Sequence, residues 1–257
     1  MHTVEVGFVL THGLADPAVE ALSSVLSAGE RTRSLRFRKP QDRVEYIVAH
    51  ALTRQLLSGW GQLPPEDWQF DADRHGKPHV VAPQAGVPPM QFNLSHTDGL
   101  VACAVTRGAA VGVDVEPLGR RVHSLPLARR FFDAGERGRL EALPTEQQQT
   151  RFLELWTLKE SFLKATGDGL SRPLRTCVFD WPDGQLSLEL DGLPTATWHC
   201  ELWEPAPGFR LGLTVDGAGQ APIVRLRQVD GTSSQYPTRR IAASDVARGA
   251  EGRVKSR

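Results

Sequence analysis

Cysteine is scarce in this chain of 257 residues, and its placement excludes two classes of protein. The three cysteines, Cys103, Cys177 and Cys200, are an odd number and lack any metal-ligand spacing. Such a set builds neither a disulfide framework nor a cysteine zinc site. We therefore expect a reduced, cytoplasmic protein.

Long apolar runs and an excess of one charge are also missing. No stretch approaches the roughly 18 consecutive apolar residues of a membrane span, so we expect no membrane association. Thirty basic side chains balance thirty acidic ones, whereas proteins that bind duplex nucleic acid usually carry a clear basic excess. We therefore expect no nucleic-acid partner. The first ten residues lack a basic start and a long apolar segment, which favours a strand over a signal peptide.

Two segments with helical spacing organise the chain. With 40% hydrophobic residues, the chain can form one large domain or two small ones. Apolar residues recur with helical spacing at 42–57 and 150–166, and several short strands follow each segment. The dipeptide Arg-Phe precedes both segments, at residues 36–37 and 130–131. This echo favours an α+β fold built from two similar α/β halves.

Proline and glycine at 117–119 mark the predicted boundary between the halves. We assign residues 1–117 to an N-terminal half and residues 118–230 to a C-terminal half. Residues 231–257 contain few apolar groups and many Arg, Ser and Gly, so we expect a disordered tail.

Two carboxylates lie on one face of a predicted strand at residues 110–115, which we expect to form a hairpin with residues 100–105. The strand period places Asp114 and Glu116 on the same face, about 6–7 Å apart at Cα. Near a core they would repel unless a cation lay between them, and hard oxygen ligands suit Mg²⁺. The alternative is a strand end whose acids face water.

An acid and a base, Glu160 and Lys164, occur in a helix that is apolar on both sides. Leucines and a phenylalanine form one face, whereas Trp156 flanks Glu160 on the other. Charged groups in such a helix are costly unless they are paired or bind a ligand. The alternative is an ordinary Glu–Lys pair on a helix surface.

Two shorter motifs have the chemistry to contact an anion. Ser95 and His96 follow an apolar strand in the segment Phe-Asn-Leu-Ser-His, where side chains and backbone amides can reach an anion. Alone, this His would more often be structural. Gly76, Lys77 and Pro78 combine close backbone approach, a positive charge and a fixed chain direction.

Together, in this order and spacing, the four motifs resemble those of the 4′-phosphopantetheinyl transferase family of the Sfp (surfactin-synthetase activating) type. The resemblance runs from about residue 4 to about residue 215. It implies two similar α+β halves about a pseudo-twofold axis, with the active site in the cleft between them. The implied reaction transfers the 4′-phosphopantetheine moiety of coenzyme A to a serine of an apo acyl or peptidyl carrier protein and releases 3′,5′-ADP.

The resemblance also implies roles for the residues that carry charge. Asp114, Glu116 and Glu160 match the family's metal-binding acids, for which the ion would be Mg²⁺. Glu160 would accept the proton of the carrier serine. Lys164 would contact the diphosphate and stabilise the departing 3′,5′-ADP.

On the nucleotide side, Ser95 and His96 match residues that contact the phosphate. The Gly-Lys-Pro segment at 76–78 matches the loop beside the adenine.

The cations for the 3′-phosphate are expected within residues 31–43, with Arg33 and Arg43 as our candidates. The match is imperfect here, because Glu30 and Glu45 stand near positions where the family pattern leads us to expect basic groups. Which residues of 31–43 bind this phosphate stays open.

The expected partners are coenzyme A and an acidic apo carrier protein. An acidic carrier needs a basic docking surface, for which we consider four arginines near the boundary: Arg120, Arg121, Arg129 and Arg130. A chain that holds both halves is expected to be a monomer.

Two rival functions stay open: a Mg²⁺-dependent nucleotide or coenzyme A hydrolase, and a non-catalytic module that binds carriers. The sequence names neither the carrier nor the pathway, and does not say whether the enzyme is dedicated or promiscuous.

Overall fold

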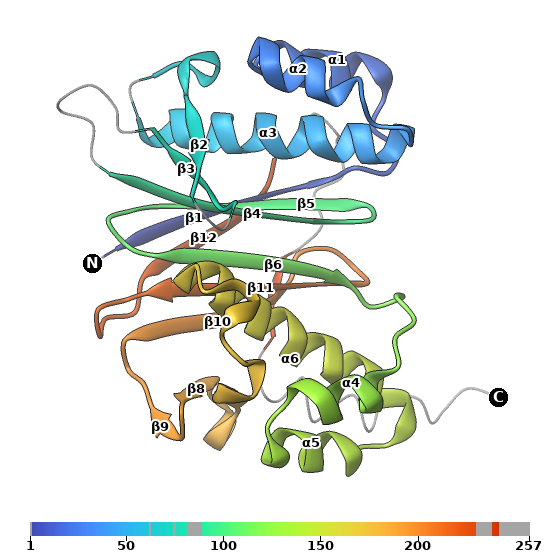
Figure 1. The fold of residues 1–257 in the computed structure, drawn as a ribbon, viewed down its shortest axis with the longest axis vertical. Helices are drawn as coiled ribbons and strands as arrows, with labels where there is room; N and C mark the ends of the chain where they lie inside the picture. The colour runs from blue at the N-terminus through green and yellow to red at the C-terminus, as the bar shows by residue number, and fades with distance from the viewer. Residues whose placement is uncertain (1, 62, 74–75, 82–88, 230–237, 242–257) are drawn as a thin grey trace.

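Two four-stranded β-sheets pack face to face at the centre of the molecule, and each carries helices on its outer face (Figure 1). The computed structural model describes residues 2–61, 63–73, 76–81, 89–229 and 238–241. Mostly valine, leucine and alanine side chains fill the space between the sheets, from alternate positions along the strands. The layers are therefore helix, sheet, sheet, helix.

The first sheet contains β12, β1, β5 and β4 in that order. Strand β1 (Thr3–Leu10) runs antiparallel to β5 (Leu100–Arg107) and parallel to β12 (Ile223–Gln228). Strand β4 (Met90–Thr97) pairs with the other edge of β5. Helix α3 (Pro40–Trp60) packs its apolar side on the outer face of this sheet.

The second sheet contains β13, β10, β11 and β6 in that order, and all of its pairs are antiparallel. The bounds are β6 (Val111–Pro117), β10 (Trp198–Glu204), β11 (Phe209–Asp216) and β13 (Arg239–Arg240). Helix α6 (Thr145–Thr166) covers its outer face and buries residues on most of its circumference, as its apolar sequence predicts.

Shorter elements surround the two long helices. In the first half these are α1 (Asp16–Ser24), α2 (Ala28–Ser34), the 3₁₀ helix Pro65–Asp67, β2 (Phe70–Ala72) and β3 (Pro78–Val80). In the second they are α4 (Ser124–Phe131), α5 (Ala134–Glu141), the 3₁₀ helices Gly169–Ser171, Leu174–Thr176 and Pro182–Gly184, β7 (Cys177–Asp180), β8 (Ser187–Leu190) and β9 (Leu193–Pro194). Both halves thus run strand, two short helices, long helix, small sheet and two strands, which confirms the expected α+β fold of two similar halves. Within the described ranges, no helix has the length and apolar character to cross a membrane.

Strand pairing corrects the expected hairpin between residues 100–105 and 110–115. Strand β5 has both edges occupied, by β1 and β4, so β6 does not pair with it. Strand β6 instead pairs with β11 of the second sheet. Strand β6 therefore belongs to the sheet of the second half, whereas the predicted division at residue 117 placed it in the N-terminal half. Strand β12, which the same division placed in the C-terminal half, pairs with β1 in the first sheet.

The structure corrects part of the prediction that residues 231–257 form a disordered tail, because residues 239–241 pack against β10. Arg239 and Arg240 pair with β10, and the backbone N–H of Ile241 donates to the carbonyl of Leu202 at 2.8 Å. Ile241 is only 6% exposed and belongs to the core around α6. This contact was not predicted, because the average composition of residues 231–257 is polar, and the single apolar residue Ile241 does not change that average. Residues 231–237 and 242–257 of the predicted tail lie outside the described residues.

Candidate active site

Two glycines allow α6 to lie directly on the second sheet. A Cβ atom at Gly112 would lie 2.0 Å from the carbonyl oxygen of Ser161, and one at Gly212 would lie 2.8 Å from that of Thr157. By the strand period, Asp114 shares its face of β6 with Gly112. The close backbone approach at Gly112 therefore brings α6 to the face of the sheet that carries the acids.

A pocket of about 390 Å³, which we call the acid pocket, lies where β4, β6 and α6 meet. Six of the residues predicted from the sequence line it: Ser95, His96, Asp114, Glu116, Glu160 and Lys164. Leu94, Thr97, Val115, Arg120 and Trp156 complete the lining. The fold thus brings together an acid pair from a strand and an acid–base pair from a helix.

Asp114, Lys164 and Ser95 form a closed triangle of polar contacts. The Lys164 ammonium donates to Asp114 Oδ1 at 2.7 Å and to Ser95 Oγ at 2.9 Å. The Ser95 hydroxyl donates to the same Asp114 oxygen at 3.0 Å. Asp114 Oδ2 is buried and has no hydrogen-bond partner among the described residues. A buried carboxylate oxygen of this kind is costly unless something binds it.

Two side chains of β4 occupy the outer edge of β6. Asn93 Oδ1 accepts from the backbone N–H of Val113 at 2.9 Å, and Ser95 Oγ accepts from that of Val115 at 3.3 Å. These contacts satisfy amides that a neighbouring strand would otherwise bind. Sequence reasoning missed Asn93, although it lies two residues before Ser95 and so shares its strand face.

The carboxyl groups of Glu116 and Glu160 both have raised pKa values. Burial is the main cause for each, and the charge of Asp114 adds to it. At Glu116 a hydrogen bond from Arg120 opposes the rise: the Arg120 guanidinium donates to both carboxylate oxygens at 2.9 Å. Arg120, whose side chain is 56% exposed, thus lines the pocket, and its expected role on a docking surface stays a prediction.

The Gly-Lys-Pro segment lies at the end of α6. Gly76 adopts a left-handed conformation (φ +80°) in a turn on Asp73, and Pro78 begins β3. The Lys77 ammonium donates to the backbone carbonyls of Lys164 and Ala165. Burial lowers the pKa of Lys77. In this structure the lysine thus caps the helix that carries Glu160.

The two arginines predicted for the 3′-phosphate lie elsewhere on the first half. Neither is among the described residues that line the acid pocket. Arg43 borders a separate pocket of about 600 Å³ between α1 and α3. The Arg33 guanidinium lies over the ring of Tyr46, 5.7 Å from its centroid. Their assignment stays a prediction.

The acid pocket offers carboxylate oxygens that could bind a divalent cation. Among the described residues, no three His, Cys, Asp or Glu side chains gather closely enough to hold a metal ion by themselves. Mg²⁺, however, usually takes only one or two protein carboxylates and completes its shell with water and phosphate oxygens. The unpartnered Asp114 Oδ2 beside Glu116 and Glu160 fits that requirement.

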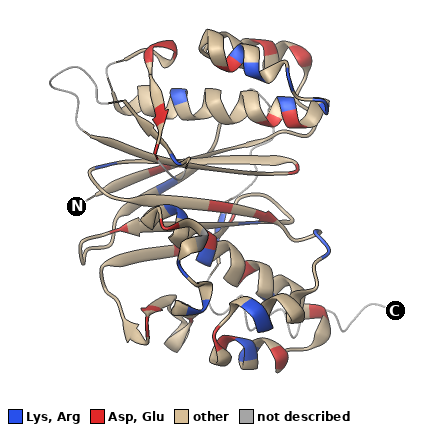
Figure 2. Ribbon diagram, in the orientation of Figure 1, with Lys and Arg blue, Asp and Glu red and all other residues tan. Residues whose placement is uncertain are grey.

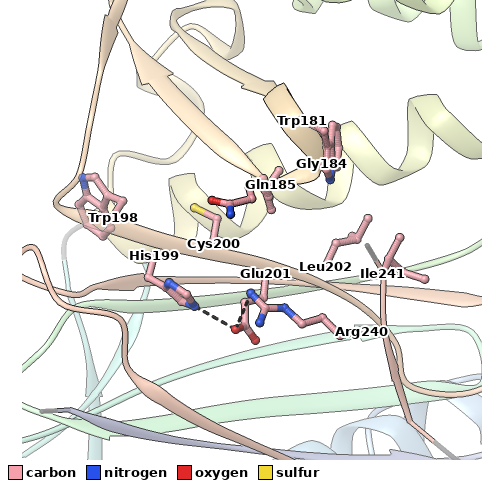
Figure 3. Close-up of a pocket in the computed structure, with 11 residues that line it drawn as sticks. Trp181, Gly184, Gln185, Trp198, His199, Cys200, Glu201, Leu202, Arg240 and Ile241 are labelled. Carbon is pink, nitrogen blue, oxygen red and sulfur yellow. Dashed lines mark hydrogen bonds and ion pairs between the residues drawn. The ribbon is translucent and has the colours of Figure 1, made fainter. Parts of the chain in front are cut away.

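A second pocket, of about 500 Å³, lies at the edge of β10 and holds no predicted site residue (Figure 3). Its polar centre is Glu201, which accepts from His199 at 2.9 Å, contacts Arg240 at 3.0 Å and accepts from the Trp203 indole at 2.8 Å. These contacts tie β13 to the sheet. Basic and acidic residues are interspersed over both halves (Figure 2), so the sign of charge alone does not mark a site.

Comparison with known families agrees with the motif pattern. The family described as "4'-phosphopantetheinyl transferase, N-terminal" matches residues 16–107, and the "4'-phosphopantetheinyl transferase superfamily" matches residues 110–214. The two matches meet just before β6.

Individual relatives carry the same name. Sfp, a 4'-phosphopantetheinyl transferase of Bacillus subtilis, is 31% identical over 80% of this chain and 89% of its own length. The transferase psf-1 of Bacillus pumilus is 35% identical over 67% and 71%. HetI of Nostoc sp. is 36% identical over 60% of this chain, and the match spans 65% of the length of HetI. Among solved structures, the holo-[acyl-carrier-protein] synthase of Thermotoga maritima aligns over 41% of this chain and 61% of its own, with 24% identity and a TM-score of 0.35.

Proposed function

The chain belongs to the 4′-phosphopantetheinyl transferase family, and we propose that it transfers the 4′-phosphopantetheine moiety of coenzyme A to a serine of an apo carrier protein. One observation supports the proposal most: Asp114, Glu116, Glu160 and Lys164 come from two elements and line one pocket.

Mg²⁺ is the proposed cofactor, and Asp114, Glu116 and Glu160 would hold it. When bound, the ion offsets negative charge on the diphosphate of coenzyme A. Part of the internal pairing would then change, because Lys164 contacts Asp114 and Arg120 contacts Glu116 in the structure.

Glu160 is the proposed general base. In the reaction the serine hydroxyl oxygen bonds to the β-phosphorus, and the bond from that phosphorus to the bridging oxygen breaks. The serine proton passes to Glu160, and 3′,5′-ADP leaves with the bridging oxygen. The position of Glu160 on the pocket lining, on the helix that also carries Lys164, supports its role as the proton acceptor.

Lys164 is the proposed partner of the diphosphate. Its ammonium is part-buried and already contacts an anionic oxygen in the pocket. Transferring this contact to the leaving oxygen would stabilise the charge that develops there.

The nucleotide contacts are proposed for Ser95, His96, Arg33, Arg43 and the loop 76–78. Of these, Ser95 and His96 line the acid pocket. The proposed carrier is acidic, and the proposed setting is a cytoplasmic monomer, because one chain supplies both halves.

The decisive experiment is incubation with coenzyme A, Mg²⁺ and several apo carrier domains, followed by intact-mass measurement. We expect one carrier serine to gain phosphopantetheine and 3′,5′-ADP to be released in equal amount. Release of nucleotide without any carrier would favour the hydrolase instead. Carrier binding without a mass change would favour the non-catalytic module.

A further inference from the structure

Glu45 is a buried carboxylate on α3 that lies outside the acid pocket. Only 7% of the residue is exposed. Its Oε1 accepts from the Gln41 side-chain amide at 3.0 Å and from the backbone N–H of Gly99 at 3.4 Å. Gly99, at φ +91°, forms the turn between β4 and β5. Glu45 therefore joins α3 to the end of the strand that carries His96.

The second oxygen of Glu45 faces His96. Glu45 Oε2 lies 3.5 Å from His96 Nδ1. The His96 side chain is 59% exposed and lines the acid pocket. Nδ1 is thus the ring nitrogen within ion-pair distance of the carboxylate, and Nε2 is the ring nitrogen left for another contact. A carboxylate that accepts from one nitrogen fixes the ring orientation and leaves the other nitrogen for a ligand.

We propose that Glu45 is a positioning residue for coenzyme A: it holds His96 so that Nε2 reaches the nucleotide phosphates. This inference rests on the proposed function, because it takes coenzyme A as the ligand of the acid pocket. A buried carboxylate beside a polyanion would weaken binding if its own charge were all that counted. If Glu45 positions His96, removing the charge of Glu45 should weaken the binding of coenzyme A. If Glu45 only repels the phosphates, removing the charge should strengthen that binding.

The test is Glu45→Gln, which keeps the shape and an acceptor for Gly99 but removes the charge. We expect Kd and KM for coenzyme A to rise about tenfold, the scale of one hydrogen bond to a charged group, with kcat within about twofold. The matched control is Asp42→Asn, an exposed acid in the first turn of the same helix, which should leave both constants unchanged. Thermal denaturation of each variant checks that the turn at Gly99 stays folded.

His96 must carry the effect. His96→Gln should raise Kd by a similar factor, and Glu45→Gln/His96→Gln should bind no more weakly than His96→Gln alone. Additive losses would show that Glu45 acts without His96 and would overturn the proposal. Unchanged or tighter binding by Glu45→Gln would overturn it too, the latter as the mark of simple repulsion.

Calorimetric binding of coenzyme A separates this inference from the proposed reaction. If wild-type protein binds coenzyme A with these dependences but modifies no carrier, the transferase proposal fails and the role of Glu45 stands. If transfer proceeds and Glu45→Gln behaves as wild type, only the role of Glu45 fails. Absence of coenzyme A binding by the wild type overturns both.

Discussion

The two halves each contain a short helix that begins with Ala-Gly-Glu-Arg, at residues 28–31 in α2 and 134–137 in α5. In each, the glutamate caps the helix: Glu30 accepts from the backbone N–H of Ser27, and Glu136 from that of Asp133. Each glutamate also pairs with a buried cation of the long helix. Glu30 contacts Arg54 of α3 at 2.9 Å, and Glu136 contacts Lys159 of α6 at 2.7 Å.

The cations also bind the chain that follows their helix. Arg54 donates to the carbonyls of Pro65 and Trp68, each at 2.9 Å, and Lys159 donates to those of Leu174 and Cys177. Arg54 and Lys159 lie fourteen residues after the first residues of their helices, Pro40 and Thr145 (54 − 40 and 159 − 145). In both halves, a buried ion pair between a helix-capping glutamate and a cation of the long helix thus fixes that helix in place.

The chemistry is not shared. Counted from the start of each helix, Glu160 corresponds to Gln55 and Lys164 to Gly59. The approach to the sheet differs as well. At Gly7 of β1 a Cβ would meet side-chain methyl groups of α3 at 3.0–3.2 Å, whereas at Gly112 it would meet the backbone of α6. A scaffold used twice is therefore combined with acids and a lysine that come from β6 and α6 of the second half only, whereas β4 of the first half adds Ser95 and His96.

The largest effect should come from Glu160→Gln. We expect transfer to fall by about 10²–10⁴-fold, the usual contribution of a general base, with the melting temperature nearly unchanged. The control is Gln55→Ala at the matching position of α3, which should keep wild-type activity. Single-turnover assays with a carrier domain measure both. Equal losses in the two variants would mean that the fold rather than the chemistry responds to the change.

Breaking the buried ion pair between Glu136 and Lys159 should cause the largest loss of stability. Lys159→Ala leaves Glu136 buried without its cation, and we expect the free energy of unfolding to fall by about 3–5 kcal/mol. Burial lowers the pKa of Lys159, which shows how costly its charge is in this place. Replacing both partners, as Glu136→Leu/Lys159→Met, should recover much of the loss in chemical denaturation. A double variant no more stable than Lys159→Ala would contradict the ion pair as the cause.

Much of the site was predictable because its residues are close in sequence and follow simple periods. Asp114 and Glu116 share a strand face, and Glu160 and Lys164 share a helix face, so local spacing was sufficient for each pair. Only the family resemblance predicted that the two pairs share a pocket. The physical cause is that Gly112 has no side chain, which lets the backbone of α6 approach β6 closely. The contact of Arg120 with Glu116 was not predicted, because Arg120 lies in a loop after β6, and a loop has no regular spacing.

The errors in the fold concern pairings between distant segments. Residues 110–115 had the right strand pattern, but their partner β11 lies about a hundred residues later, and a short glycine turn suggested the nearer strand. The helix at 28–34 was missed because its seven residues bury only Ser34. Its capping box and the contact with Arg54 stabilise it, and the second of these depends on the tertiary fold.

Gly112→Ala tests the close helix approach. We expect a loss of about 3 kcal/mol, because backbone atoms of α6 must move to admit the methyl group. Gly7→Ala should cost about 1 kcal/mol, since leucine side chains can rotate away. Urea denaturation compares the two, and the Gly112 variant should also lose transfer activity as Glu160 is displaced. Similar costs at both glycines would remove the distinction between the halves.

Acid should weaken the first half through Glu30. Burial alone raises the pKa of Glu30, but hydrogen bonds from His50 and from the backbone N–H of Ser27, with the charges of His50 and Arg54, lower it from 4.5 to about 2. A lowered folded-state pKa gives stability that is present above about pH 4.5 and is lost as pH falls toward 2. We expect a loss of about 2 kcal/mol over this window, less than the full shift implies because the carboxyl is partly exposed. Glu30→Gln should flatten this part of the stability curve, and an unchanged slope would show that other carboxylates dominate.

The smallest effect should distinguish the strands added to each sheet. Ile241 follows β13 and is 6% exposed, whereas Ile223 on β12 is 42% exposed. Ile241→Ala removes methyl groups from the core around α6, but at the margin of the sheet the neighbours can partly close the gap. We therefore expect a loss of about 1.5 kcal/mol, below the usual cost of a buried isoleucine, and less than about 0.5 kcal/mol for Ile223→Ala. Urea midpoints at constant m-value measure the difference. Equal midpoints would mean that Ile241 does not contribute to the core in solution, and that the second sheet is stable without β13.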